Sequence, residues 1–362
     1  MSILIRPYAE ADIPAVLDFN RRLSAGGAAE QLVFPEHPLP RWLPKVDGSQ
    51  IYNQFFLAIE EDAVRGAYAI KMQDFSFHGQ TQAIGYYHHP LSEGIVNKSY
   101  AAVGALVLRD ALQQEPVMYA LGMEGYDKPL PKMLKAMGWK DFLAPFYFKV
   151  IHPSRFLREM EMLRVSAGRR LLMDLAAFTG TGWIGIRAAQ FRRPARVVYE
   201  RIREFDRWVD RIWETAKSAY AMTAVRDCDA LCTLYPAENS RFPRLRVGDI
   251  GWAVVAEQSK NPKYGNLRVG VILDCFASPE HARTIVNAAA RELEREGVDL
   301  IVSNQSDVRW GHAFHSAGFL RGPSTFIFAA SKKLTAKLAP FEANKDSIHV
   351  SRADGDGLYQ YV

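Results

Sequence analysis

The sequence predicts an α/β (α+β) fold of two consecutive domains, each with a mixed, mostly antiparallel sheet flanked by helices. Its 362 residues exceed what one compact core usually holds. Strand and helix patterns follow one another as β-α-long loop-β-β-β-α-β-α-β in the first part of the chain, and similar spacing returns later. We expect an N-terminal domain at 1–152, a basic helical linker at 153–200, a C-terminal domain at 201–334 and a tail at 335–362.

The elements of the first domain follow from local signals. Residues 3–7 predict a strand, and Asp12 and Pro14 predict a helix start, as N-cap and first-turn proline. Gly, Pro and polar residues make 24–48 a long loop. Further strands are expected at 55–59, 67–75, 81–89, 116–121 and 142–151. Pro90 should end the strand that precedes it. Helices are expected at 98–112 and 131–137, the second ended by a left-handed Gly138.

The second half repeats an aromatic pattern of the first. The pattern Gly-aromatic-x6-Phe-x-Phe occurs at 138–148 and again at 318–328, an offset of 180 residues. Strands before the second copy are expected at 251–258, 267–276 and 300–304. A helix should begin at Ser278-Pro279 and run to Glu296, and a short one at 309–317. This repeated order predicts tandem domains of one architecture.

Charge and cysteine usage exclude several classes of protein. Residues 155–196 hold nine arginines and three acidic residues, a net +6 in a chain of net +5. A wholly basic nucleic-acid surface is therefore disfavoured. The three cysteines give neither a disulfide framework nor metal spacing, so we expect no metal. Reduced thiols and the lack of a signal peptide at the start predict a cytoplasmic location, or one at the inner face of the membrane.

The linker between the domains is apolar as well as basic. Residues 171–191 contain only Asp174 and Arg187 as charged residues, and Gly180-Thr-Gly182 interrupts them. Three interpretations stay open: two helices packed on the domains, an amphipathic hairpin on anionic lipid, or a membrane span. The second predicts peripheral contact with an anionic membrane through 155–196.

The order of elements over the first 150 residues or so resembles the GNAT superfamily, the Gcn5-related N-acyltransferases. The segment 5–13, with Ile-Arg-Pro and then Glu-Ala-Asp-Ile, is similar to the start of such domains, and 134–139 is similar to their closing helix and Gly-aromatic step. The resemblance implies acetyl-CoA or another acyl-CoA between two splayed strands. It places the pyrophosphate on a loop of the form Arg/Gln-x-x-Gly-x-Gly/Ala. The first, fourth and sixth positions of this motif are Lys98, Ala101 and Val103 here. The basic residue is kept as Lys, and both glycines are missing.

The resemblance therefore implies a CoA-binding loop at 91–104 in the first domain. Its expected cofactor-binding residues are Leu91, Ser92, Gly94, Asn97, Lys98, Ser99, Ala101, Val103 and Gly104. A loop that opens a helix also presents free N–H groups to an anion. The second domain has Glu280 where phosphate would bind and is the weaker candidate.

The usual acid of the family is absent. In many members a Tyr four residues before the closing Gly protonates the thiolate, and those positions are Leu134 and Phe314 here. Alternation along a strand puts Tyr86 and His88 on one face and Tyr87 and His89 on the other. A histidine is a plausible base for an amine. The candidate catalytic residues are His88, Tyr86, Glu93, Glu124 and Tyr126.

We expect a bacterial acyl-CoA-dependent N-acyltransferase, of acetyl type, that acts on a small-molecule amine or a cell-envelope precursor. Two alternatives stay open. A FemAB-like aminoacyl transferase would use aminoacyl-tRNA near the membrane, which the basic linker fits. A non-catalytic GNAT-fold scaffold or binding protein is favoured by the missing glycines and Tyr.

Overall fold

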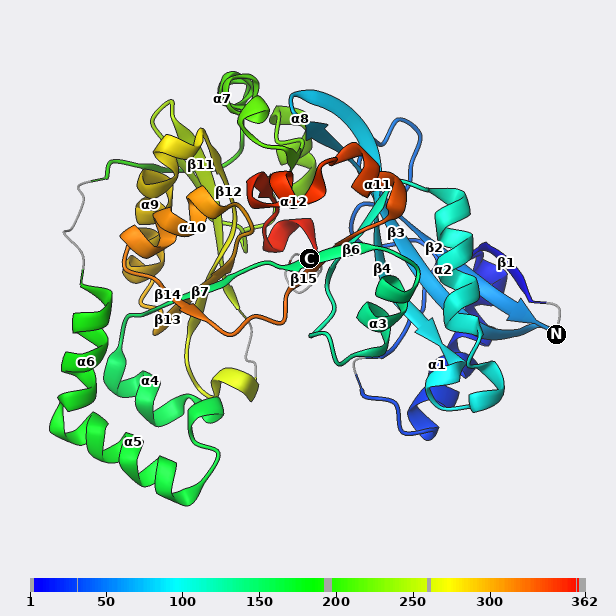
Figure 1. Ribbon diagram of the computed structural model, residues 1–362, viewed down its shortest axis with the longest axis horizontal. Helices are drawn as coiled ribbons and strands as arrows, with labels where there is room; N and C mark the ends of the chain where they lie inside the picture. Colours follow the sequence, from blue (N-terminus) through cyan, green and yellow to red (C-terminus); the bar gives the residue numbers. More distant parts are fainter. Residues whose placement is uncertain (1–2, 31, 192–196, 259–261, 356, 358–362) are drawn as a thin grey trace. The chain divides into compact units, whose positions relative to one another are not determined.

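The computed structural model describes residues 3–30, 32–191, 197–258, 262–355 and 357, and the chain forms two compact units (Figure 1). The first unit comprises Met1–Phe75, Thr81–Phe142 and Ile327–Phe341. The second comprises Ser76–Gln80, Leu143–Phe326 and Glu342–Val362. Each unit thus contains segments from both halves of the chain.

The first unit is a mixed sheet in the order β1-β2-β3-β4-β5-β15-β6. Its strands are β1 (Leu4–Pro7), β2 (Tyr52–Glu60), β3 (Ala63–Phe77), β4 (Gln80–Ser92), β5 (Met118–Gly122), β6 (Lys140–Leu143) and β15 (Ile327–Ala330). Its helices are α1 (Ile13–Ala25), α2 (Val103–Gln114), α3 (Pro129–Ala136) and α11 (Lys332–Lys337). Two 3-10 turns, Glu93–Ile95 and Lys98–Tyr100, lie between β4 and α2.

Apolar residues on both faces of this sheet form its core. Phe55 and Leu57 pack with Val16 and Phe19 of α1 on one face. Phe56, their neighbour in sequence, packs with the residues of α2 and α3 on the other face. The strands of the first unit are therefore covered by helices on both sides, which explains their nearly continuous burial.

The second unit has a sheet in the order β14-β7-β13-β12-β11-β10-β8. Its strands are β7 (Phe146–Val150), β8 (Glu200–Ile202), β10 (Arg244–Val247), β11 (Gly251–Gln258), β12 (Val269–Ala277), β13 (Leu300–Asn304) and β14 (Leu320–Gly322), with β9 (Met222–Ala224) pairing β16 (Ile348–His349) apart from them. Its helices are α4 (Pro153–Glu159), α5 (Ala167–Thr179), α6 (Thr181–Gln190), α7 (Trp208–Ala216), α8 (Cys228–Leu234), α9 (Ala282–Arg295) and α10 (Val308–Ser316), and α12 (Phe341–Asn344) begins at the last residue of the first unit.

The two repeats exchange their last strands. In the first repeat α3 is followed by β6 and β7, and in the second α10 is followed by β14 and β15. β7 pairs with β13 and β14 in the second sheet, and β15 pairs with β5 in the first. The sequence analysis assigned all of 142–151 to one strand of the first domain. The structure instead divides it between two sheets, because Ala144-Pro145 interrupts the pairing.

Two local expectations are wrong. Pro90 does not end its strand, because β4 continues to Ser92. Its parallel partner β5 has already separated at Tyr86, so the missing N–H of Pro90 breaks no bond to β5. Asp12 does not cap α1 with its side chain, but pairs with Arg6 at 2.6 Å.

The linker is helical, as the sequence predicts, and it forms three helices. α5 and α6 meet at Gly180, whose φ of +76° ends one helix and starts the next. Across the described part of the chain, no helix is long and apolar enough to cross a membrane. Residues 171–190 are divided between α5 and α6.

Candidate functional site

The central strands of the first unit diverge. β4 and β5 are parallel, and their register covers only Gly85–Met118 and Tyr86–Tyr119. Beyond this point β4 runs on to Ser92 and β5 to Gly122. The hydroxyl of Tyr86 donates to the carbonyl of Leu121 at 3.1 Å, so a side chain satisfies a backbone oxygen of β5 past the last pair.

The backbone of β4 is strained just after it leaves β5. His89 has a φ of +48°, a left-handed conformation that is rare for a residue with a side chain. Such strain persists only where the surroundings impose it, and it is common at functional sites. It also turns His89 out of the simple alternation that the sequence analysis assumed.

Tyr86 and His88 lie on one face of β4, as the sequence predicts. Their rings stack with centroids 5.0 Å apart, and both side chains are buried. Lys71 of β3 places its ammonium 5.7 Å from the Tyr86 ring, and Asn53 of β2 is the strand partner of Lys71. These four residues form a buried polar cluster in an otherwise apolar sheet.

The hydrogen bonds of this cluster fix the histidine tautomers. The amide nitrogen of Asn53 donates to the carbonyl of Trp42 at 3.1 Å, so its oxygen faces His88 Nε2, also at 3.1 Å. His88 Nε2 must then carry the proton. His88 Nδ1 is left as an acceptor and lies 2.8 Å from His89 Nδ1, which must be the donor. The second ring nitrogen of His89, Nε2, takes no part in this contact.

His88 is held neutral. Burial, followed by the charges of His89 and Lys71, lowers the pKa of His88 well below its ordinary value. The sequence analysis did not select Asn53, Lys71 or His89 as site residues. A signal was present for Lys71, because a lysine and a glutamine at 71 and 73 alternate with Ile70 and Met72 inside a predicted strand.

The loop predicted to bind pyrophosphate is folded on itself. Its N–H groups at Val96, Asn97, Tyr100 and Ala101 bond to carbonyl oxygens of the loop, and Ser99 N–H bonds to the Asn97 side chain. Lys98, Asn97, Ser99 and Ala101 are exposed, whereas Leu91, Ser92 and Val103 are buried. Val103 belongs to the core beneath α2. Fewer N–H groups are therefore directed outward than in a glycine-rich loop.

Two residues of the loop hold its shape. A Cβ on Gly94 would lie 2.6 Å from the carbonyl oxygen of Tyr100, so this close approach requires glycine. Gly104, near the start of α2, is partly buried and leaves more room. Glu93 is buried and pairs with Arg22 at 3.1 Å and Arg65 at 3.0 Å. In this structure Glu93 joins the loop to α1 and β3.

The remaining predicted residues lie apart from the histidine pair. Glu124 is exposed and 3.9 Å from Lys128. Tyr126 donates to Asp141 at 2.5 Å, and burial together with this bond raises the pKa of Tyr126, which makes it a weaker acid. Leu134, at the position of the family's usual Tyr, is a core residue.

The second unit has a matching divergence, and its own chain bridges it. β12 and β13 are parallel only from Val269–Leu300 to Val271–Val302. Beyond that point Ser351 bridges to Gln305 after β13 and donates to Asp274 of β12 at 3.4 Å. Residues 348–354 thus contact both separated strands.

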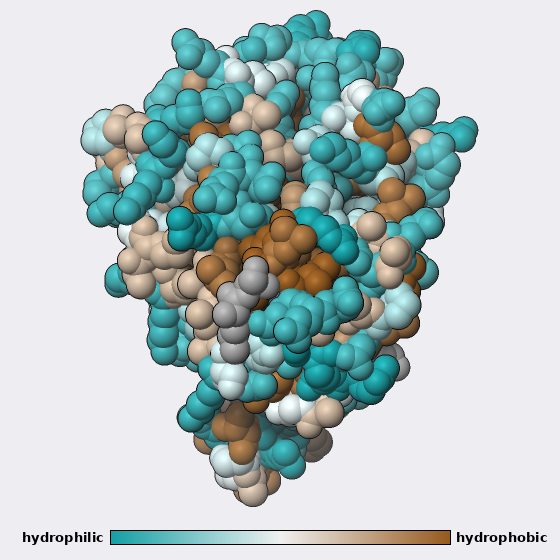
Figure 2. Space-filling model, turned by 90° about the vertical axis from the view of Figure 1, so that its right-hand side faces the viewer, coloured by the Kyte–Doolittle hydropathy of each residue, from teal (hydrophilic) through white to brown (hydrophobic). Residues whose placement is uncertain are grey.

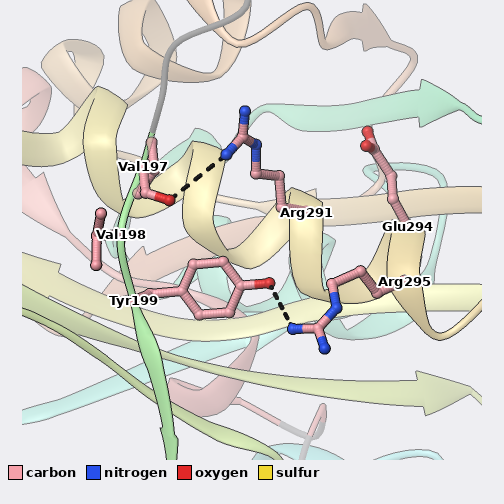
Figure 3. Close-up of a pocket in the computed structure, with 6 residues that line it drawn as sticks. All are labelled: Val197, Val198, Tyr199, Arg291, Glu294 and Arg295. Carbon is pink, nitrogen blue, oxygen red and sulfur yellow. Dashed lines mark hydrogen bonds between the residues drawn. The ribbon is translucent and has the colours of Figure 1, made fainter.

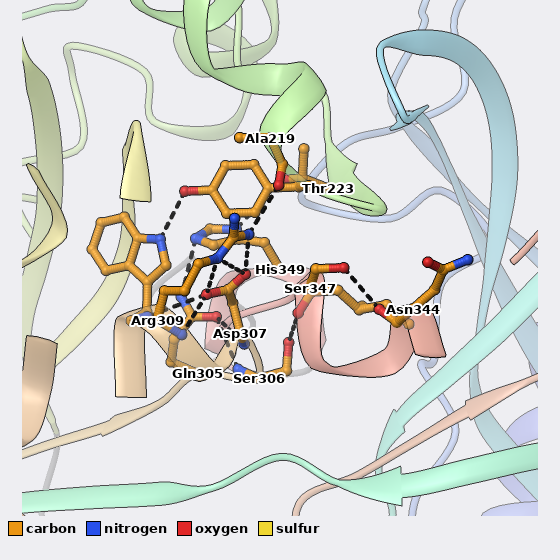
Figure 4. A network of polar contacts seen from close by, with 12 residues as sticks. Ala219, Thr223, Gln305, Ser306, Asp307, Arg309, Asn344, Ser347 and His349 are labelled. Carbon is orange, nitrogen blue, oxygen red and sulfur yellow. Dashed lines mark hydrogen bonds and ion pairs between the residues drawn. The ribbon is translucent and has the colours of Figure 1, made fainter. Parts of the chain in front are cut away.

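Buried charges hold this C-terminal segment in place. Arg226 is buried and bonds Asp274 at 2.7 Å and Asp354 at 2.6 Å. Burial alone would lower the pKa of Arg226, but the two carboxylates raise it above its ordinary value. Figure 4 shows the neighbouring network, in which His349 lies 3.1 Å from Gln305 and 3.3 Å from Thr223. The polar residues at 303–305 therefore serve the fold.

A pocket of about 630 Å³ lies elsewhere in the second unit (Figure 3). It is lined by Val197, Val198, Tyr199, Arg291, Glu294 and Arg295. Arg291 donates to the Val197 carbonyl and Arg295 to the Tyr199 hydroxyl, both at 3.5 Å. The arginines are from α9, which flanks the sheet, and the pocket includes no residue of the diverging strands.

Metal ligation finds no support in the described part of the chain, where no group of three or more His, Cys, Asp or Glu could hold an ion. Cys228 and Cys232 lie on α8 with sulfurs 3.9 Å apart, and Cys275 is buried in β12. All three are free thiols.

Comparison with solved structures identifies the fold. A scan of protein-family models and a search of curated proteins give no match. *Saccharomyces cerevisiae* N-myristoyltransferase with bound myristoyl-CoA and inhibitors aligns over 91% of this chain and 79% of its own, with 9% identity and a TM-score of 0.52.

Two further structures agree. A GCN5-related N-acetyltransferase from Anabaena variabilis aligns over 91% of this chain and 72% of its own, with 9% identity and a TM-score of 0.51. A probable N-acyltransferase from Enterococcus faecalis aligns over 92% and 74%, with 8% identity and a TM-score of 0.51. The chain therefore has the fold of the GNAT superfamily, with two GNAT-like domains in tandem.

Proposed function

We propose that this chain is an acyl-CoA-dependent N-acyltransferase and that its acyl-CoA binds in the first unit, along the diverging strands β4 and β5. The observation that carries the proposal is the separation of β4 from β5 after Tyr86, with a strained, half-buried His89 in contact with the buried His88 at that point. In the second unit the equivalent separation is bridged by residues 348–354, which favours the first unit as the site.

The reaction is the transfer of an acyl group from a thioester to an amine. The amine nitrogen attacks the thioester carbon, the carbon–sulfur bond breaks, and the nitrogen loses a proton while the thiolate gains one. His89 Nε2 is the atom proposed to accept the amine proton. His88 is a positioning residue, because its Nδ1 accepts from His89 and its protonated Nε2 is held by Asn53.

The chain also has residues that suit the CoA phosphates. Lys98 is exposed on the turn before α2, and the positive end of the α2 dipole lies close in sequence. Because many of the loop's N–H groups are already bonded, we propose that Lys98 supplies more of the phosphate affinity than the backbone does.

Thermal unfolding with and without acetyl-CoA tests the proposal. At a ligand concentration a hundred times Kd, binding should add about 2.7 kcal/mol of stability. Lys98→Ala should lose most of this shift. Lys333→Ala, an exposed lysine on α11 of the same unit, is the matched control and should keep it.

A second candidate function is a non-catalytic binding protein with the same fold. The core positions of Leu134 and Phe314 and the self-bonded loop favour it. It predicts no shift with acetyl-CoA for any variant. Release of free thiol from acyl-CoA in the presence of an amine panel would establish the enzyme instead.

A further inference from the structure

A helical hairpin of the second unit exposes apolar side chains. α5 and α6 are joined at Gly180 and pack on α4, so closely that a Cβ on Gly182 would lie 2.4 Å from Leu157 Cδ1. Figure 1 shows the hairpin at the lower left, outside the sheet of its own unit. Its inward positions are therefore used for packing, and its outward positions are free for another role.

The outward side of the hairpin is strongly apolar. Leu171, Leu175 and Phe178 follow one another at i, i+4 and i+7, so they form one stripe along α5. Phe178 is 83% exposed and Leu171 72% exposed. Leu172 of α5 and Trp183 and Ile184 of α6 extend this surface. Contiguous exposed side chains of this size mark a contact surface.

An arginine borders the apolar stripe. At 100° per residue, Arg170 in the first turn of α5 lies to one side of the stripe, whereas Arg169 lies on the opposite side of the helix. Asp174, the acidic residue of the same helix, accepts two hydrogen bonds from Arg164, at 2.7 and 3.1 Å. No carboxylate in the described part of the chain lies within ion-pair distance of Arg169 or Arg170. The surface therefore combines apolar bulk with uncompensated positive charge.

We propose that the outer face of the α5–α6 hairpin binds the surface of an anionic lipid bilayer. Helices of 13 and 10 residues are too short to span the hydrocarbon, so they would lie in the interface with their apolar side chains inserted. Arg170 would bind a phosphate group of the lipid heads. This proposal does not depend on the acyl transfer proposed above.

The positive charge beside the apolar stripe is what selects a lipid over other partners. Figure 2 shows another hydrophobic patch, bordered by hydrophilic surface. The hairpin differs because its charge and its apolar stripe both match an anionic membrane surface.

Co-sedimentation of the full chain with vesicles tests the proposal. The chain should bind vesicles of phosphatidylcholine mixed with phosphatidylglycerol, and bind phosphatidylcholine alone much more weakly. Arg170→Gln should lower the affinity about fivefold. The double variant Leu171→Ser and Phe178→Ser should abolish binding at the concentration that half-saturates the wild type.

Leu4→Ser is the matched control, since Leu4 is 62% exposed but lies on β1 of the first unit, and it should bind as the wild type does. Equal binding to both kinds of vesicle, or unchanged binding of the double variant, would overturn the proposal. Self-association that the double variant removes, without vesicle binding, would also overturn it, because the face would then bind a second copy. Circular dichroism confirms that each variant is folded.

Discussion

His89 is the residue whose chemistry depends most on its backbone. Its φ is +48°, and its Nδ1 lies 2.8 Å from His88 Nδ1, so Nε2 is the ring nitrogen that this contact does not use. We predict that His89→Asn lowers kcat for acyl transfer by about a hundredfold, with little change in the KM for acyl-CoA. Asn tolerates the left-handed conformation, so the strand should keep its shape while the base is lost.

Two further variants test whether His89 acts as the base or has only a structural role. His312→Asn replaces an exposed histidine on α10 and should leave kcat unchanged. His88→Gln can still donate to Asn53 and accept from His89, so it should retain more activity than His88→Ala. If His89→Asn kept full activity in a steady-state assay, His89 would not be the base.

Burial of His88 also links stability to pH. Its folded pKa is lowered well below the unfolded value of about 6.5. The unfolded chain therefore binds a proton below pH 6.5 that the folded chain does not. The contribution of neutral His88 to the free energy of unfolding is present above pH 6.5 and is lost as the pH falls toward the folded pKa. Each pH unit in that window should lower the free energy of unfolding by up to about 1.4 kcal/mol.

Urea unfolding at pH 7.5 and 5.5 measures this effect. His88→Gln should reduce the loss of stability between the two pH values. Burial also lowers the pKa of His349 in the second unit, so His349 should make a separate contribution to the pH dependence of stability. An unchanged pH dependence in both His88→Gln and His349→Gln would show that the two imidazoles are accessible to protons in the folded chain.

At the scale of elements, the C-terminal segment is expected to be part of the second unit's core. Asp354→Asn removes one of two carboxylates from the buried Arg226. Loss of one partner of a buried ion pair typically destabilises by about 3–5 kcal/mol. Asp346→Asn, an exposed acid five residues before the bridging Ser351, should change stability by less than about 0.5 kcal/mol. A small effect of Asp354→Asn in urea unfolding would mean that the segment can leave the strands.

The sequence predicts elements better than it predicts their partners. The 180-residue aromatic repeat correctly indicates two copies of a short helix followed by strand structure, because helix periodicity and Gly stops are local signals. It does not show that β7 and β15 change sheets, since strand pairing depends on edges formed by distant parts of the chain. Pro90 is misjudged for the same reason: its effect depends on whether its neighbour strand is still paired.

The sequence predicts where the candidate site lies, but it identifies only some of the residues of the site. The strand at 81–89 and its Tyr86–His88 face follow from alternation. The outward turn of His89 does not, because a left-handed non-glycine backbone leaves no mark in the residue pattern. The role of Glu93 also depends on a distant contact, with Arg22 on α1.

At the scale of the whole molecule, the strand exchange makes each unit depend on both halves of the chain. β15 pairs along β5 from Ile327–Gly122 to Ala330–Tyr119. Ser331 adds three bonds, accepting from Met118 N–H at 3.2 Å and donating to the Met118 and Pro116 carbonyls through its N–H and hydroxyl. Without this segment, β5 would have an unpaired edge and the core would lose Ala329.

We therefore predict that a fragment of residues 1–152 does not unfold cooperatively in a thermal melt followed by circular dichroism. Joining 324–341 to its C-terminus through a flexible Gly/Ser linker should restore a cooperative transition, because the added strand can pair with β5 in the same molecule. A version of the same fusion with Ile327 and Ala329 replaced by Asp is the matched control and should stay uncooperative, since both residues are buried. A cooperative transition of the fragment alone, at the temperature of the full chain, would mean that the exchanged strand is dispensable and that the first half folds by itself.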